Sequence, residues 1–568
     1  MMSLQVQTRP FLTDPISFPH LSPFMARVMA RRGLSSEQEL ELKLQHLLKP
    51  NLKGLTQAVE YIDQAIDLHK KIIIIGDYDA DGATSTALMI LALRALGANV
   101  EYLVPDRFKY GYGLTPAIAD LAYQQFQPDV LITVDNGISS HAGVEQAQKL
   151  GMQVIITDHH LTTKATPQAE AVVNPNQLGC EFASKNLAGV GVAFYVLASL
   201  MTHRAKQQKS NVKMSQYLDL VALGTYADVA QLDYNNRILI DAGVKKIRQK
   251  QCRLGILAIL EVAKRQAELL QAQDFGFSIG PRLNAAGRMD NMQIGVECLL
   301  AEDWQTAYSL AERLNQLNLE RRQVETKMKQ QVLEELQHIE IQHHNLPSAL
   351  VMFEEHFHQG VIGIVAGRLK DKFHRPSIVF APDINPQYIK GSARSIDGIH
   401  IRDMIERVAE QYPHLVCFFG GHSAAAGLTI EKQYFNEFKR VFCELISQCD
   451  DELFSAKLWT DGELSIDEFN LSTVEQIQYY APWGHKFPSP VFEGKFYVMD
   501  YRWLKETHLK LFLTTSTGQS LQAIAFNAKD KWYFDPQSTH VFLVYELDKN
   551  EFNGQVELQL KVNYLKSV

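Results

Sequence analysis

The sequence has few cysteines, and no two of them form a metal-binding pair. Its six cysteines are scattered over 568 residues without a CxxC motif. A disulfide framework or a structural zinc site would need closer grouping or a secreted context. The sequence therefore argues against both and fits a reducing cytoplasm.

Long apolar runs, a signal peptide and an excess of positive charge are also missing. The longest apolar stretch, near 190–201, is shorter than the ~20 residues that span a bilayer. The opening residues, MMSLQVQTRP, lack the charged-then-apolar order of a signal peptide. With a net charge of −8, a nucleic-acid partner would need a local basic channel. We therefore expect a cytoplasmic protein with no membrane partner.

Between residues 70 and 175, β-rich apolar runs alternate with helical patterns. The runs lie at 71–77, 99–106, 129–137, 152–160 and 169–175. Continuous Ile/Val runs predict strands that are buried on both faces, and hence a parallel sheet covered by helices. Ligands of such sheets bind beyond the carboxyl ends of the strands. The length of the chain further predicts two to four domains.

Acidic and histidine side chains follow three of these strands. They are Asp77, Asp79 and Asp81 after the first strand, Asp135 after the third, and Asp158, His159 and His160 after the fourth. An isolated aspartate at such a position is usually a helix cap or a turn residue. Capping does not explain three strand ends of this kind in one sheet. Close carboxylates repel each other unless a cation neutralises them, so we predict a metal site.

Mixed aspartate and histidine ligands without thiolates favour Mn2+ or Mg2+. Asp228 follows an apolar helical run and would complete the set, although alone it would be an ordinary helix-end residue. Two such ions ~3.5–4 Å apart would activate a water and hold phosphoryl oxygens, with Asp79 and Asp135 central to catalysis. The predicted metal ligands are Asp77, Asp79, Asp81, Asp135, His159 and Asp228.

The two histidines receive different predicted roles. Adjacent side chains alternate in direction along an extended chain, so only one of the two easily reaches the same metal. We assign His159 as the ligand, Asp158 as the residue that orients it, and catalytic His160 as a phosphate contact or proton donor.

The rest of the chain predicts three further parts. A long helix near 303–340 precedes a second α/β unit near 346–455. In the last ~105 residues, HLKLFLTT and QVELQLKV alternate apolar and polar residues, and Asn553-Gly554 is typical of a hairpin turn. This pattern predicts a small antiparallel barrel or sandwich. For 109–113 (KYGYG), base stacking and a tight turn are equally good interpretations.

DYDADG, VDNG, DHH and the later Asp228 resemble, in this order, the four motifs of the DHH phosphoesterase superfamily. The usual histidine before the first motif is absent, because 73–75 are isoleucines. The resemblance to the RecJ branch implies that Asp81 supplies the missing ligand. Which of the three aspartates in DYDADG bind directly stays open. Further segments resemble the RecJ family over nearly the whole chain: 278–289, 358–369, 391–395, 420–427 and 482–494.

This resemblance implies an α/β fold in which a parallel-sheet DHH domain is joined by a long helix to a second α/β domain, DHHA1, followed by an OB-like β domain. The implied boundaries are 1–300 for the N-terminal segment and catalytic DHH domain, 301–343 for the connecting helix, 344–456 for the substrate-binding DHHA1 domain and 457–568 for the OB-like, nucleic-acid-binding domain.

The resemblance also implies a function. It is a 5′→3′ exonuclease that degrades single-stranded DNA to 5′-mononucleotides by two-metal-ion hydrolysis, in recombination and repair. Its implied partners are a single-stranded-DNA-binding protein and a RecQ-type helicase. By the same similarity Arg394 and His422 bind substrate phosphate, with Arg282 and Arg288 nearby along the path of the DNA.

Two other functions compete with this one. A related DHH phosphodiesterase would cleave short oligoribonucleotides or cyclic dinucleotides, but such chains are compact two-domain enzymes. A non-catalytic replisome scaffold would have lost its metal ligands, whereas every candidate ligand is present here.

Overall fold

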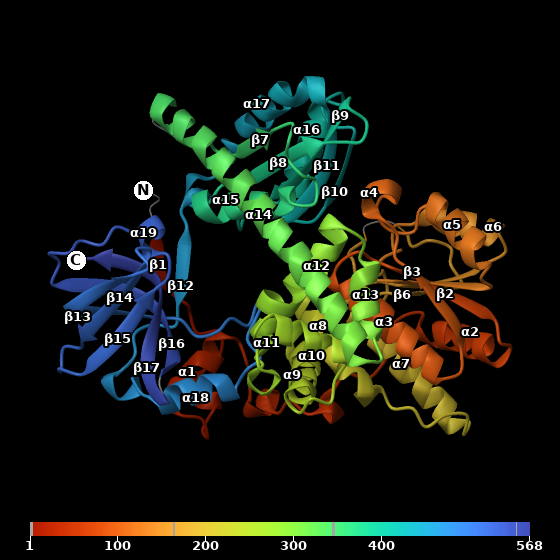
Figure 1. Ribbon diagram of the computed structural model, residues 1–568, viewed down its shortest axis with the longest axis horizontal. Coiled ribbons are helices and arrows are strands. Elements are labelled where there is room, and N and C mark those ends of the chain that lie inside the picture. Colours follow the sequence, from red (N-terminus) through yellow and green to blue (C-terminus); the bar gives the residue numbers. More distant parts are fainter. Residues whose placement is uncertain (1–3, 163–164, 344–346, 553) are drawn as a thin grey trace. The chain divides into compact units, whose positions relative to one another are not determined.

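The computed structural model describes residues 4–162, 165–343, 347–552 and 554–568 (Figure 1). The chain divides into two compact units, each built from separate stretches of sequence. The first unit comprises Met1–Gln5, Asn284–Asn291 and Arg313–Leu458, and the second comprises Val6–Leu283, Met292–Glu312 and Trp459–Val568. Both the region of the acidic motifs and the C-terminal region therefore belong to the second unit.

The second unit contains the parallel sheet that the sequence predicts. Its strand order is β3-β2-β4-β5-β6, and every neighbouring pair is parallel. The residues of β4 and the isoleucines of β2 are buried, as expected for strands covered on both faces. The strands are β2 (Lys71–Gly76), β3 (Asn99–Leu103), β4 (Val130–Val134), β5 (Gln153–Thr157) and β6 (Ala171–Val173).

Helices cover this sheet and extend it into a helical layer. One face packs on α5 and α6, through a core that includes Ile73, Leu131 and Ile118. On α3, nearly every residue is buried, because this helix packs against the sheet and also against α7 and α8. The helices are α2 (Leu55–Asp67), α3 (Ala80–Ala95), α5 (Pro116–Phe126), α6 (His141–Lys149), α7 (Gly189–Lys206), α8 (Leu218–Ala227), α9 (Tyr234–Arg248), α10 (Leu254–Val262) and α13 (Gln293–Leu300). Helix α12 (Gly280–Met289) is divided between the two units.

The first unit contains a mixed sheet of order β10-β11-β9-β8-β7, in which only β7 and β8 are parallel. The long helix α14 runs over Trp304–His343, as the sequence predicts, and packs with α15 through Met328 and Val332. A second core lies between the sheet and α16 and α17. The elements are β7 (Leu350–Phe353), α15 (Ile362–Phe373), β8 (Ser377–Pro382), β9 (Tyr388–Arg394), α16 (Ile401–Gln411), β10 (Phe418–Gly421), β11 (Ala425–Glu431) and α17 (Phe435–Ile446).

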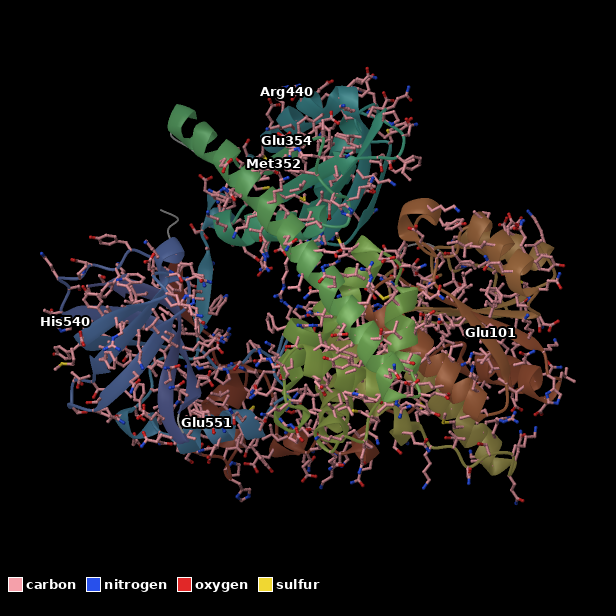
Figure 2. All side chains as sticks on the ribbon, in the orientation of Figure 1. Glu101, Met352, Glu354, Arg440, His540 and Glu551 are labelled. Atoms are coloured by element: carbon pink, nitrogen blue, oxygen red, sulfur yellow. The ribbon has the colours of Figure 1, made fainter. Side chains whose placement is uncertain are left out.

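The C-terminal part of the second unit is a closed barrel of order β13-β14-β15-β17-β16. The prediction of an antiparallel barrel is wrong for one pair, since β15 and β17 run parallel. Five strands cannot close with every neighbour antiparallel, because an odd number of alternating directions leaves one parallel pair. The predicted turn at Asn553 lies outside the described residues. The strands are β13 (Phe492–Leu504), β14 (His508–Thr514), β15 (Ser520–Ala525), β16 (His540–Phe552) and β17 (Gln555–Ser567); Figure 2 labels His540 and Glu551 on β16.

The N-terminal segment of the second unit contacts the region just before the barrel. Arg32, which follows α1 (Pro23–Arg31), forms a buried ion pair with Asp461, and its guanidinium donates to the carbonyl of Pro488. Ser22 donates a hydrogen bond to Gln476 on α18 (Leu471–Tyr479). In the described ranges, no helix is both long enough and apolar enough to cross a membrane.

Candidate metal centre

The three aspartates of the first motif occupy the junction between β2 and α3. Asp79 is the N-cap of α3, and its carboxylate accepts the backbone N–H groups of Asp81 at 2.9 Å and Gly82 at 3.0 Å. Asp77 and Asp81 are buried. A Cβ at Gly82 would lie 2.4 Å from the carbonyl oxygen of Asp77, so this turn needs glycine. Capping explains the geometry of Asp79, but not why two further carboxylates are buried beside it.

The carboxylate of Asp81 faces the first residues of α7. It accepts the backbone N–H of Gly189 at 2.6 Å and that of Val190 at 2.9 Å. A Cβ at Gly189 would lie 2.6 Å from the Oδ1 atom of Asp135, so glycine lets the two carboxylates approach. Sequence reasoning missed these two residues; their one signal is the segment AGVGVAF (188–194), which opens an apolar helix.

Asp135 lies just beyond the carboxyl end of β4 and is buried. Its φ is +61°, in the left-handed region that few residues other than glycine adopt without strain. The neighbouring Asn136 donates to the carbonyls of Ile75 at 3.1 Å and Val134 at 2.9 Å, which ties the ends of β2 and β4 together. The backbone around the candidate site is thus held from both strands.

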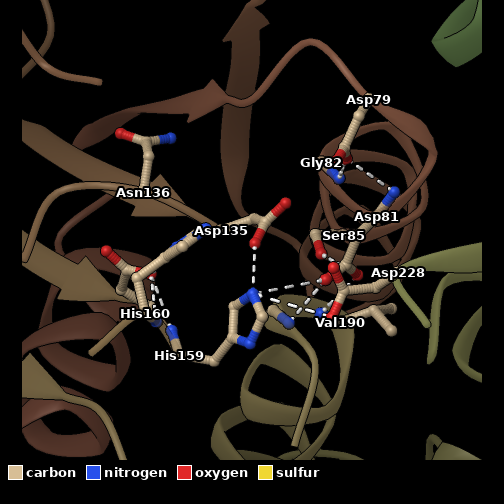
Figure 3. A network of polar contacts seen from close by, with 12 residues as sticks. Asp79, Asp81, Gly82, Ser85, Asp135, Asn136, His159, His160, Val190 and Asp228 are labelled. Carbon is tan, nitrogen blue, oxygen red and sulfur yellow. Dashed lines mark hydrogen bonds and ion pairs between the residues drawn. The ribbon is translucent and has the colours of Figure 1, made fainter. Parts of the chain in front are cut away.

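The ring of His159 meets carboxylates from three different elements (Figure 3). Its Nε2 atom lies 3.0 Å from Asp135 Oδ1 and 3.9 Å from both Asp81 Oδ2 and Asp228 Oδ2. Asp228 caps the C-terminal end of α8. Residues far apart in the sequence therefore converge at the carboxyl edge of the sheet, where the sequence places them.

The predicted role of Asp158 needs a correction. Its Oδ1 atom accepts from Nδ1 of His160 at 2.7 Å, whereas its contact with His159 is to the backbone N–H at 2.7 Å. Asp158 therefore orients the ring of His160 rather than that of His159. The reason is that β5 ends at Thr157, so the alternation of an extended strand does not govern the two histidines.

Both histidines lie beside the cluster, and the assignment of His159 alone as the metal ligand stays a prediction. Three groups of side chains could each hold a metal ion, because the ligand atoms within each group all lie within 4.8 Å of one another. They are Asp135, His159 and His160; Asp81, His159 and Asp228; and Asp77, Asp79 and Asp135. All six predicted metal ligands occur in these groups, and Asp135 and His159 are each shared by two.

Tyr112 lies at the rim of the cluster, although sequence reasoning did not place it there. Its hydroxyl is 3.3 Å from Nε2 of His160, and its ring meets the rings of His160 and Tyr78 edge-on at 6.0 Å. The side chain is half exposed. The KYGYG segment thus borders the candidate site, and base stacking stays a prediction.

The electrostatics of the cluster favour a bound cation. Burial, and next the charge of Asp79, raise the pKa of Asp81 to about 7. Burial, and next the charge of Asp81, raise the pKa values of Asp135 and Asp228 well above their usual range. These carboxylates resist ionising together unless positive charge lies between them. Oxygen and imidazole donors without a thiolate fit Mn2+ or Mg2+.

In the Asp158–His160 pair, unlike in the cluster, the charged forms of both side chains are favoured. Burial alone would raise the pKa of Asp158, but the hydrogen bond and charge of His160 lower it to about 2. Burial alone would lower the pKa of His160, but the hydrogen bond and charge of Asp158 raise it to about 9. The carboxylate of Asp158 therefore favours the protonated form of His160.

Two of the predicted phosphate-binding residues lie together in the first unit. Arg394 ends β9 directly opposite Ala425 of β11, and the backbone of His422 donates to the carbonyl of that alanine. The guanidinium of Arg394 donates to Ser392 Oγ at 3.0 Å and Ala393 O at 2.8 Å, and burial lowers its pKa. In the described part of the chain, no carboxylate forms an ion pair with Arg394, so its charge is available for an anion.

The other two predicted phosphate-binding residues lie on α12. Arg288 belongs to the first unit, where its carbonyl packs so closely on Gly360 that a Cβ there would lie 2.2 Å away. Arg282 belongs to the second unit and donates to the carbonyl of Ser278 at 2.6 Å. Their predicted contact with DNA stays a prediction.

Three family models match successive parts of the chain. The DHH family N-terminal domain matches residues 71–225, the DHHA1 domain residues 346–448 and the RecJ OB domain residues 460–564. Together with the parallel sheet and its acidic edge, these matches define the class as DHH/DHHA1 proteins.

Individual proteins narrow this class. A Haemophilus influenzae protein named single-stranded-DNA-specific exonuclease RecJ is 45% identical over 559 residues, 96% of each chain. The crystal structure of RecJ from Thermus thermophilus in complex with Mn2+ matches with a TM-score of 0.84 at 27% identity, over 99% of this chain and 79% of that one. The same organism's RecJ in complex with Mg2+ gives 0.77 at 25% identity, over 99% and 78%. The chain belongs to the RecJ family.

Proposed function

We propose that the chain is a metal-dependent exonuclease that degrades single-stranded DNA in the 5′→3′ direction and releases 5′-mononucleotides. The observation that carries the proposal is the set of three donor groups at the sheet edge, in which Asp135 and His159 each belong to two groups. It is supported by family membership, since the Haemophilus relative is named as a single-stranded-DNA-specific exonuclease.

The donor groups suggest how the chain would hold two ions. Asp77, Asp79 and Asp135 would hold one, and Asp81, His159 and Asp228 the other. RecJ structures that contain Mn2+ or Mg2+ support this choice of ions. When bound, the ions would activate a water and neutralise the phosphoryl oxygens during in-line displacement.

His160 would act on the substrate rather than only on the metal. Asp158 fixes its ring through Nδ1, and this hydrogen bond and charge raise the pKa of the ring, which favours its protonated form. A protonated imidazole held beside the donor groups can contact a phosphate oxygen or donate a proton to the leaving oxygen.

The first unit would supply phosphate contacts. Arg394 and His422 share one edge of its sheet, and the Arg394 guanidinium is partly buried without a counter-ion in the described residues. An arginine in this state suits a phosphodiester, which it can bind through two parallel hydrogen bonds. By family resemblance Arg282 and Arg288 would extend these contacts along the strand.

The barrel offers a basic and aromatic row for the DNA backbone and bases. Lys495, Phe542 and Lys566 lie directly opposite one another on β13, β16 and β17, and Arg502 pairs with Lys510 on the neighbouring strand. The sequence neighbours of Lys495, Phe542 and Lys510 are buried, so these three side chains lie on the outer surface of the barrel. Arg502 and Lys566 are themselves exposed. Such a row can bind a single strand by stacking and by backbone charge.

The cellular part of the proposal rests on family resemblance alone. It comprises DNA recombination and repair in the cytoplasm, with a single-stranded-DNA-binding protein and a RecQ-type helicase as partners. We expect either partner to co-purify with the full chain. Loss of co-purification in a folded variant with an altered surface would map the interface.

End-labelled single strands test polarity and product. On a 5′-labelled single strand of about 30 nucleotides, we expect the labelled mononucleotide to be the first product and its release to require Mn2+. Release of a 3′ label should come only after the strand is consumed, and a blocked 5′ end should stop degradation. First release from the 3′ end would contradict the polarity. Faster cleavage of short oligoribonucleotides or cyclic dinucleotides would favour the related phosphodiesterase instead.

A further inference from the structure

Asp228 is more exposed than Asp81, Asp135 and His159 among the proposed ligands. Its carboxylate is 24% exposed, whereas those of Asp81 and Asp135 are 0% and 2% exposed. The next residue, Val229, is β-branched, has a φ of +61° and is largely exposed. This backbone conformation is strained for valine and persists only where neighbouring contacts hold it. The loop 228–232 must therefore be fixed from outside the acidic cluster.

Residues 483–487, which we call the clamp segment, contact both ends of this loop. Before Asp228, the hydroxyl of Tyr226 donates to the carbonyl of Trp483 at 3.0 Å. After it, the backbone N–H of Leu232 donates to the carbonyl of His485 at 2.9 Å. The two hydrogen bonds thus hold the chain on either side of the ligand.

Gly484 brings the clamp segment into close contact with the same two residues. A Cβ on Gly484 would lie 2.7 Å from Cδ1 of Leu232 and 3.2 Å from Cε2 of Tyr226. The segment is itself a tight turn, in which Gly484 and Phe487 exchange backbone hydrogen bonds of 2.8 and 3.1 Å. Its shape therefore fits the loop that it contacts.

The clamp segment is anchored by a stack of buried side chains. The rings of Trp483 and Phe487 stack at 5.1 Å, and the indole N–H donates to the carbonyl of Ile477 at 2.8 Å. The guanidinium of Arg237, on α9, lies 4.1 Å from the Phe487 ring, and that of Arg32 lies 5.8 Å from the Trp483 ring. Because these groups are desolvated, cation–π attraction gives the segment a fixed position.

We propose that the clamp segment positions Asp228 for metal binding, with Tyr226 as the positioning residue that transmits the contact. Tyr226 touches neither substrate nor metal in this account; it fixes the end of α8 two residues before the ligand. The inference rests on the proposed function, because it assumes that Asp228 binds a metal ion. It gives the C-terminal third of the chain a part in building the metal centre, besides any contact with DNA.

Mn2+ titration of the full chain, followed by the EPR signal of the free ion, tests this inference without relying on activity. Tyr226→Phe removes the hydroxyl and keeps the ring packing. We expect it to raise, by about 5-fold, the Mn2+ dissociation constant of the site that Asp228→Ala also weakens, the effect expected of one lost hydrogen bond. Gly484→Ala should weaken the same site. Tyr195→Phe, which removes a buried hydroxyl bond to Asn235, is the matched control and should bind Mn2+ as the wild type does.

The double variant Tyr226→Phe/Asp228→Ala shows whether the effect passes through the ligand. If it does, the double variant binds Mn2+ no more weakly than Asp228→Ala alone. Two results would overturn the inference and leave the proposed function intact. One is that Tyr226→Phe binds Mn2+ with the affinity of the wild type. The other is that Tyr226→Phe lowers the Mn2+ affinity of Asp228→Ala by the same factor as that of the wild type. Failure of the wild-type chain to bind Mn2+ would overturn the proposed function, and the inference with it.

Discussion

His159 and His160 are adjacent, but they contact different side chains, and we propose different roles for them. The ring of His159 faces three carboxylates, whereas Asp158 holds the ring of His160. We expect His159→Ala to weaken both Mn2+ binding and turnover, and His160→Ala to lower turnover at least about 100-fold with a much smaller loss of affinity. Calorimetric Mn2+ titration beside single-turnover rates separates the two effects. Equal losses of affinity would show that His160 also binds metal directly, as one of the donor groups allows.

The Asp158–His160 pair predicts a pH dependence of stability in the metal-free protein. The pKa of His160 is raised to about 9, so its contribution is full below about pH 6.5 and is lost as pH rises through 9. The pKa of Asp158 is lowered to about 2, so its contribution is present above about pH 4 and is lost as pH falls through 2. In chelator, Asp158→Asn should therefore cost most between about pH 4 and 6.5, of the order of 2 kcal/mol. Urea unfolding at pH 5.5 and pH 9.5 measures it; a cost that grows with pH would be the wrong sign.

Among the elements, the first turn of α7 contacts the carboxylates of both Asp81 and Asp135 through Gly189. Gly189→Ala would place a Cβ 2.6 Å from Asp135 Oδ1, so we expect it to reduce Mn2+-dependent hydrolysis at least about 10-fold. Gly191→Ala, two residues further along the helix, is the control. Its Cβ would meet only the side chain of Leu187, with Cδ2 at 3.2 Å and Cβ at 3.4 Å, and alanine favours a helix. Equal activity of the two variants would contradict a role for the first turn of α7 in shaping the site.

The strands and the acidic motifs can be predicted from the sequence because each has a local signature. The runs at 71–77 and 129–137 are largely apolar, as buried parallel strands require, and the carboxyl ends of such strands meet at one edge. This places Asp77 and Asp135 together without any knowledge of the fold. Long-range pairing is beyond such reasoning: the contact of Gly189 with Asp81 joins residues 108 positions apart, and the local pattern at 188–194 predicts a helix but not this contact.

The histidine that Asp158 orients is mispredicted for a different reason. The prediction extends the strand through His160, but β5 ends at Thr157, and strand ends are the least certain part of a sequence-based prediction. The barrel is predicted from alternation, which reports the buried and exposed faces of a strand but not the direction of its neighbour. The parallel pairing of β15 and β17 therefore has no sequence signal.

At the scale of the whole molecule, the barrel row should set how affinity for long single strands depends on salt. Replacing Lys495, Arg502 and Lys566 with alanine removes up to three phosphate contacts and should reduce the slope of log affinity against log salt by about 2. Cleavage of very short oligonucleotides should change little. The control replaces Lys43, Lys245 and Lys250, exposed lysines of the same unit outside the barrel. Identical slopes for both triple variants would contradict a DNA-binding role for the row.

We propose that the Asp/His cluster at the sheet edge is the metal centre that hydrolyses single-stranded DNA. Asp135→Asn tests it most directly, because Asp135 belongs to two of the donor groups and asparagine tolerates its left-handed backbone. The control, Asp129→Asn, alters an exposed aspartate just before β4, at the opposite edge of the sheet. The measurement is the rate of nucleotide release from 5′-labelled single-stranded DNA across a Mn2+ titration. We predict no release without metal, near wild-type rates for Asp129→Asn, and a loss of at least about 1,000-fold for Asp135→Asn with an unchanged melting temperature in chelator. Release that is independent of metal, or near-normal turnover by Asp135→Asn, would contradict the account.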